Sequence, residues 1–123
     1  MELDFNYREL IVYSKSKDLV KSTYSLLKKF PKEEQYALCD QIRRAVISVP
    51  SNIVEGNARA SEKEKARFFD IAYGSLMESL CQLEIAKELH YINNEELINI
   101  ELQVQEIAKL LSALRLKFLS SKL

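Results

Sequence analysis

Residues that break helices are scarce in this chain. Its 123 residues include only 2 glycines and 2 prolines, whereas an all-β fold needs turn residues every few positions. Apolar residues make up 47% of the sequence and charged residues 29%, which is the balance of a folded domain rather than of a disordered chain. The length fits one domain. The sequence therefore predicts a single all-α domain over residues 1–123.

An excess of either charge sign is also missing. The 18 Lys and Arg residues balance 18 Asp and Glu residues, so the chain lacks the strongly basic composition that is typical of nucleic-acid binding. No apolar stretch approaches the ~18–20 residues that cross a bilayer. Residues 1–6 contain no basic region followed by an apolar run, which argues against a signal peptide. We therefore expect a cytoplasmic protein with no membrane partner.

Residues for metal binding and catalysis are equally sparse. Cys39 and Cys81 form no CxxC pair, and neither lies near His90, the single histidine. Buried thiols are thus a simpler interpretation than a zinc site or a disulfide framework. Di-iron bundles use Glu-x-x-His motifs on two helices, and the chain also lacks a phosphate-binding glycine loop and a nucleophile–histidine spacing. We expect no catalytic residue, metal, cofactor or small-molecule substrate, and we interpret His90 as a helix-boundary residue.

Apolar residues at three- and four-residue steps predict two long helices in the first half of the chain. The first should run over residues 7–29, because Pro31 pushes the residue before it out of the α region. Its predicted buried stripe is Leu10, Tyr13, Val20, Tyr24 and Leu27. The second should start near Lys32 or Glu33 and end near Gly56, a natural C-terminal stop, with a kink at Pro50. Its predicted stripe is Leu38, Ile42, Val46, Val49 and Ile53.

Two further helices follow. Ser61 and Glu64 form a capping-box pattern that opens the third helix, which fades near His90. Its predicted stripe is Phe68, Ala72, Ser75, Leu76, Ser79, Leu83 and Ala86. Residues 93–96 supply a turn and a second cap, and the fourth helix carries Leu97, Ile100, Val104, Ile107, Leu111, Leu114 and Phe118. Short turns make neighbouring helices antiparallel, which predicts an up-down four-helix bundle.

The second and third predicted helices carry more apolar residues than one bundle needs. Tyr36, Ile47 and Val54 share a flank about 120–140° from Ile42. On the third helix a second row contains Ile71, Gly74, Glu78, Cys81 and Ile85. A glycine inside a helix costs ~1 kcal/mol relative to alanine, so Gly74 predicts a close backbone approach. The flanks either pack within the monomer or form a subunit interface, and exposed apolar patches favour the interface. The predicted interface residues are Tyr36, Ile47, Val54, Ile71, Gly74 and Ile85.

Polar residues interrupt the same two helices and predict a structural network. Its predicted members are Arg44, Asn52, Glu55 and Glu78. A buried carboxylate needs a partner, but Arg44 and Glu55 are roughly 16 Å apart along the helix axis. We therefore expect a partner from another helix or subunit, with Arg43, Arg44 and Arg59 as candidates. The favoured interpretation is a network that fixes helix register; the alternative is a polar site for a nucleic-acid backbone or a partner chain.

Several motifs together resemble a known family. They are Leu10-Ile11-Val12-Tyr13, Phe30-Pro31-Lys32-Glu33-Glu34-Gln35-Tyr36, Gln41-Ile42-Arg43-Arg44-Ala45-Val46, Asn52-Ile53-Val54-Glu55-Gly56 and Gly74-Ser75-Leu76 with Glu78. The chain resembles the bacterial four-helix bundle proteins first noticed as open reading frames within 23S ribosomal RNA intervening sequences. The match covers the first three predicted helices closely and the fourth in pattern only. The resemblance implies an up-down bundle that assembles into a homopentamer and has no established enzymatic activity.

The chain is also similar to the accessory proteins of diversity-generating retroelements, which are basic pentamers that bind a reverse transcriptase and nucleic acid. It departs from that branch in being neutral. It also has Tyr13 and Ser16 where the family usually has Trp and Ala, which affects the local packing of the first helix.

We therefore expect a non-enzymatic oligomeric bundle that serves as an interaction or accessory protein. The alternative is an RNA- or DNA-binding module whose pentamer concentrates cations into a basic surface. Such binding depends strongly on salt, because cations that neutralise phosphates release counterions. The candidate nucleic-acid contacts are Arg43, Arg44, Arg59 and Lys63.

Overall fold

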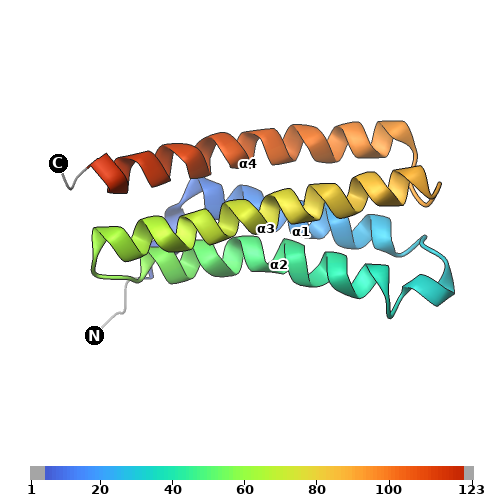
Figure 1. Ribbon diagram of the computed structural model, residues 1–123, viewed down its shortest axis with the longest axis horizontal. Helices are drawn as coiled ribbons and strands as arrows, with labels where there is room; N and C mark the ends of the chain where they lie inside the picture. The colour runs from blue at the N-terminus through green and yellow to red at the C-terminus, as the bar shows by residue number, and fades with distance from the viewer. Residues whose placement is uncertain (1–4, 121–123) are drawn as a thin grey trace.

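The chain folds into a bundle of long helices. The computed structural model describes residues 5–120, in which four α-helices and no strand occur: α1 (Ile11–Leu27), α2 (Leu38–Asn57), α3 (Glu62–Glu88) and α4 (Asn94–Ser120). The expectation about a signal peptide rests partly on residues 1–4, which lie outside the described residues, as do residues 121–123. Figure 1 shows the α2–α3 connection at the end where α4 finishes, and the other two connections at the opposite end. The predicted all-α four-helix bundle is confirmed.

Two helices begin later than predicted. α1 begins at Ile11 because Asn6–Glu9 forms a separate 3₁₀ helix and Leu10 is extended, with φ −70° and ψ 125°. α2 begins at Leu38, after a 3₁₀ helix at Lys32–Glu34 and a non-helical Ala37. Short 3₁₀ turns use the same kinds of residues as α-helices, so the sequence pattern did not separate them. α2 continues through Pro50, and the kink stays a prediction.

The buried stripes of α2 and α4 are largely as predicted, but of the predicted α1 stripe only Leu27 is buried. Ile42, Val46, Val49 and Ile53 of α2 are fully buried, and the α4 stripe is buried from Leu97 to Leu111. The buried positions of α1 are Val12, Ser16, Leu19, Thr23 and Leu27. Two of them are hydroxyl residues, so the core face of α1 does not appear as an apolar stripe in the sequence. On α3 it is Phe69, not Phe68, that lies in the core.

The two glycines have roles different from those predicted. α2 ends at Asn57, next to the predicted Gly56, but the φ of Gly56 is not positive, so this glycine does not cap the helix in the left-handed conformation. A Cβ at Gly56 would lie 3.0 Å from Phe68 Cβ and 3.0 Å from Phe69 Cε1. A Cβ at Gly74 would meet no described atom within 4 Å. Within the chain, the close approach predicted at Gly74 is therefore wrong, and it occurs at Gly56 instead.

Side chains and backbone geometry close the ends of α3 and α4. The Ser61 hydroxyl accepts a bond from the Glu64 amide at 3.0 Å. Asn93 and Glu96 form the reciprocal box, in which each side chain accepts a bond from the other's amide, at 2.8 and 2.9 Å. His90 has a left-handed φ of 65°, and the amide of Tyr91 bonds the carbonyl of Ala86 at 2.9 Å. This is a Schellman ending, which confirms His90 as a boundary residue.

Contacts between the helices are uneven. α2 packs extensively on α3, and α3 packs extensively on α4, while α1 contacts its neighbours less. Phe69 stacks on Phe118 of α4 with ring centroids 5.8 Å apart. Polar side chains join α1 to α4: Lys15 bonds Glu106 at 2.7 Å, and Ser22 and Gln103 bond each other. The α1–α2 side of the bundle is thus packed less closely than the α2–α3 side.

Candidate interaction surface

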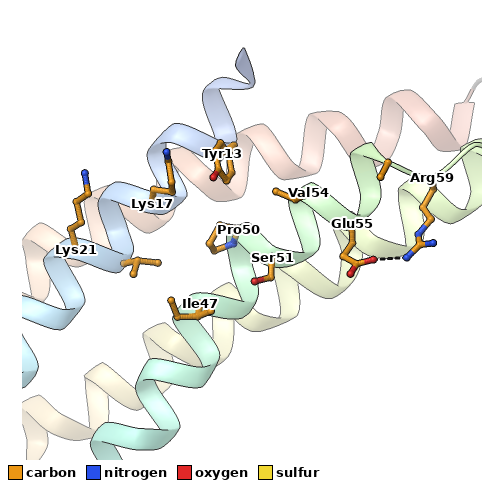
Figure 2. Close-up of a pocket in the computed structure, with 11 residues that line it drawn as sticks. Tyr13, Lys17, Lys21, Ile47, Pro50, Ser51, Val54, Glu55 and Arg59 are labelled. Carbon is orange, nitrogen blue, oxygen red and sulfur yellow. Dashed lines mark hydrogen bonds and ion pairs between the residues drawn. The ribbon is translucent and has the colours of Figure 1, made fainter. Parts of the chain in front are cut away.

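A groove of about 840 Å³ lies between α1 and α2. Figure 2 shows Ile47, Pro50 and Val54 along its α2 side, opposite residues of α1. Tyr13 and Val20 line the α1 side. Both had been assigned to the buried stripe of α1, and both are only half-buried, because the core face of that helix lies one position away. The groove therefore has an apolar lining formed by side chains that the bundle leaves partly uncovered.

The rim of the groove on α1 is cationic. Lys17 and Lys21 lie one turn apart, and both are exposed. The Lys17 ammonium lies 4.6 Å from the centroid of the Tyr13 ring. Among the described residues neither lysine pairs with a carboxylate. On α2 the nearby Glu55 is already paired with Arg59, so the unpaired charge of the groove is positive.

A second uncovered surface runs along the outer face of α3, and we call it the α3 row. It consists of Ile71, Gly74, Glu78, Cys81 and Ile85, all of which are exposed. The prediction of buried thiols is thus wrong for Cys81, because the outer face of α3 is uncovered in the chain. It is confirmed for Cys39, whose burial raises the pKa of its thiol. The α3 row and the groove contain most of the predicted interface residues.

The structure places those predicted interface residues in three regions. Ile47 and Val54 lie in the groove, and Ile71, Gly74 and Ile85 lie on the α3 row. Tyr36 belongs to neither surface: it stands in the α1–α2 connection, where 90% of it is exposed. The prediction placed Tyr36 on the same helical flank as Ile47, and the late start of α2 separates them.

The predicted polar network is not one network. Asn52 donates to the backbone carbonyl and hydroxyl of Ser48, at 2.8 and 2.9 Å, and the Ser48 hydroxyl bonds that of Ser75 at 2.8 Å. Glu55 instead pairs with Arg59 one turn away. The Ser48–Ser75 bond joins α2 to α3. The pairing was missed because each serine was considered on its own helix.

Glu78 and Arg44, the other two predicted members, remain at the surface. Glu78 accepts a bond from Gln82 at 3.3 Å, and both Glu78 and Arg44 are exposed beside the Ser48–Ser75 pair. Arg44 makes no hydrogen bond or ion pair with another described side chain. Glu55 and Glu78 are both exposed, so neither carboxylate needs the partner that a buried charge would require.

The four candidate nucleic-acid contacts do not gather in one patch on the chain. Arg43 bonds Gln35 and Asp40 near the start of α2, whereas Arg59 lies past its end. At that end the Arg59 and Arg67 guanidinium groups lie 4.6 and 4.7 Å from the centroid of the Phe68 ring. Lys63 lines a hollow there with Arg67 and Arg115. Cations thus group at the α2–α3 end, and Arg43 and Arg44 are separate from them.

Shifted pKa values occur at the opposite end of the bundle and have structural causes. The hydrogen bond to Glu34, at 2.8 Å, raises the pKa of Tyr91. Bonds from Lys29 and from the Asn93 amide lower the pKa of the Glu96 carboxyl. Across residues 5–120, no three His, Cys, Asp or Glu side chains are grouped as a metal site. No helix in that range is both apolar enough and long enough to span a membrane.

Comparisons with known proteins agree with the fold. The family model described as 23S rRNA-intervening sequence protein matches residues 8–113. A crystal structure of a protein of unknown function from the S23 ribosomal protein family of Bacteroides thetaiotaomicron is similar, with a TM-score of 0.79 and 25% sequence identity. The similarity covers 85% of this chain and 98% of that one. A comparison with curated proteins finds no match. Neither the family description nor the structure names an enzymatic activity.

Proposed function

Because the chain belongs to the 23S rRNA-intervening sequence protein family, we propose that it is a non-enzymatic bundle that assembles with copies of itself and acts as an interaction or accessory protein. The observation that carries the proposal is the apolar surface that the folded chain leaves uncovered. Ile47 in the groove is 41% exposed, and Ile71 and Ile85 of the α3 row are 39% and 45% exposed.

Burial of this surface favours association. Each Å² of apolar surface removed from water contributes roughly 25 cal/mol, and grouped apolar side chains on a soluble protein usually mark contact sites. The groove and the α3 row together extend over three of the four described helices. The apolar residues of these surfaces therefore support an assembly in which they are covered.

The mass of the purified protein in solution tests the proposal. Sedimentation velocity or light scattering at micromolar concentration should give a mass near five times the 14.3 kDa of the chain, the number that the resemblance implies. A monomer throughout the micromolar range would overturn self-association. A different closed assembly would retain self-association and overturn the count of five.

A second candidate function is nucleic-acid binding, and it is supported by the cations at the α2–α3 end. Repetition of Lys63, Arg67 and Arg115 in an assembly would concentrate positive charge. Carboxylates weaken this potential, because Arg67 pairs with Glu64 and Arg115 pairs with Asp70. Fluorescence anisotropy with labelled RNA should show affinity that falls steeply with salt. Lys63→Glu should lower the affinity, with Lys109→Glu on α4 as the control, and salt-insensitive or absent binding would exclude this function.

A further inference from the structure

The groove and the α3 row have opposite unpaired charge. Lys17 and Lys21 give the groove two positive charges, and the nearby Glu55–Arg59 pair adds none. From Glu78 to Glu88 the outer part of α3 carries three glutamates and one lysine, Lys87, a net charge of −2. Among the described residues, none of these three glutamates forms an ion pair. The two surfaces are therefore electrostatically complementary as well as apolar.

The spacing of the charges also matches. Lys17 and Lys21 are four residues apart on α1, and Glu84 and Glu88 are four residues apart on α3, so each pair spans one helical turn. At about 100° per residue, both glutamates lie beside Cys81 at the edge of the α3 row. Both are exposed. Two ion pairs can therefore form at once between a groove and an α3 row that lie side by side.

The lengths of the apolar parts are comparable. From Ile71 to Ile85 the α3 row extends about 21 Å, and the α2 side of the groove, from Ile47 to Ala58, extends about 16 Å. A chain cannot place its own α3 row in its own groove, because α3 packs on α2 through the Ser48–Ser75 side while the row faces outward. The occupant of the groove must come from another molecule.

We propose that the groove of one copy receives the α3 row of a second copy, with Lys17 and Lys21 facing Glu84 and Glu88. This inference rests on the proposed self-association and names the surfaces that form it. Two different surfaces meet, so the contact is head-to-tail: the first copy retains a free α3 row, and the second copy retains a free groove. Repetition of such a contact closes a ring when a whole number of the rotations that relate one copy to the next adds up to a full turn.

Gly74 has a role in this arrangement. It lies in the α3 row with open space where a Cβ would be, and glycine inside an exposed helix costs ~1 kcal/mol relative to alanine. A glycine there lets a helix of the second copy approach the α3 backbone closely. The close contact expected from the sequence is thus assigned to the interface between copies.

Charge reversal tests the pairing. We expect Lys17→Glu with Lys21→Glu to weaken assembly about tenfold or more in light scattering at low salt, because two attractions become repulsions. Glu84→Lys with Glu88→Lys should do the same. Lys28→Glu with Lys109→Glu is the control matched to the lysine reversal. It lowers the net charge by the same amount at exposed positions outside both surfaces and should leave assembly unchanged. Circular dichroism and thermal melting of each variant verify that the bundle is folded.

The variant with all four reversals provides the decisive measurement. It has a negative groove and a positive α3 row, so a groove-to-row contact restores assembly. A contact of groove with groove, or of row with row, leaves like charges opposed and restores nothing. If the wild type assembles and neither double reversal weakens it, or if the fourfold variant stays dissociated, the pairing is wrong while self-association stands. A monomeric wild type would instead overturn the proposed function itself.

Discussion

The two sides of α2 differ in how completely they are packed. Toward α3, Gly56 brings the backbone of α2 against Phe68 and Phe69, and the Ser48 and Ser75 hydroxyls meet at 2.8 Å. Toward α1, the same helix borders a groove of about 840 Å³. The difference follows from what α1 contributes to the core, since two of its five buried residues are Ser16 and Thr23. Tight packing on one side fixes the bundle, and the looser side leaves a surface for another molecule.

The largest expected effect comes from two isoleucines of α2 on its packed and open sides. Ile53 is fully buried, so Ile53→Ala should lower the free energy of unfolding by about 2–5 kcal/mol, through lost burial and a cavity. Ile47→Ala makes the same chemical change in the groove and should cost less than about 0.5–1 kcal/mol. Urea unfolding at low protein concentration measures both without a contribution from assembly. Equal losses would show that the groove is closed in solution.

The two glycines give the next largest effect, with opposite signs. Gly56→Ala should destabilise the chain by about 1–3 kcal/mol, because the added methyl group overpacks against Phe69. Gly74→Ala should stabilise the isolated chain by up to about 1 kcal/mol, because its site is open and alanine favours the helix. Thermal melting of the two variants beside wild type measures the contrast. Destabilisation by Gly74→Ala in a monomeric sample would contradict the open site.

The polar contact between α1 and α4 should show a smaller effect that depends on pH. Glu96 bonds Lys29 just after α1 and also caps α4 at Asn93. Glu96→Ala removes both contacts and should cost about 1–2 kcal/mol at pH 7. Glu96→Gln keeps a side chain that can accept the Asn93 amide bond but loses the ion pair, and it should cost about half as much.

The pH dependence follows from the direction of the pKa shift. The pKa of Glu96 in the folded chain is below its ordinary value of 4.5. The unfolded chain therefore binds this proton first as the pH falls. The stabilising contribution is complete well above pH 4.5 and disappears as the pH falls through the folded value. Unfolding of wild type and Glu96→Gln should thus converge in acid, and a constant difference from pH 7 to pH 3 would contradict the assignment.

The sequence predicted best the helices in which the spacing of apolar residues and the capping residues agree with the packing of the folded chain. In α4 the apolar steps continue without a break from Leu97 to Leu111, and the buried residues are those predicted. The cap at Asn93–Glu96 was predicted because both residue types favour that position. The apolar flanks on α2 and α3 could also be predicted, because helical spacing shows which residues share a face.

Features that depend on another helix were not predictable from local spacing. Gly56 and Gly74 both lie inside helical patterns, and only the position of Phe69 decides which one is crowded. The groove was missed because Tyr13 and Val20 were assigned to the core of α1. Tyr13 and Val20 are apolar enough to suggest burial, but the smaller residues Ser16 and Thr23 are the ones that lie on the core face of α1. The candidate site therefore lies along the helix that contributes two polar residues, Ser16 and Thr23, to the core.

Thr23 provides the smallest and most specific test of this account. Its hydroxyl is fully buried and has no hydrogen-bond partner among the described atoms, and a buried polar group without a partner costs free energy. Thr23→Val replaces the hydroxyl with a methyl group of similar shape and should raise the free energy of unfolding by up to about 1 kcal/mol. Ser16→Ala is the matched control, because the Ser16 hydroxyl donates to the Tyr13 carbonyl at 2.8 Å and its loss should bring no such gain. If Thr23→Val destabilises the chain in urea unfolding, the hydroxyl has a partner in solution, and the core face of α1 is not weakened at this position.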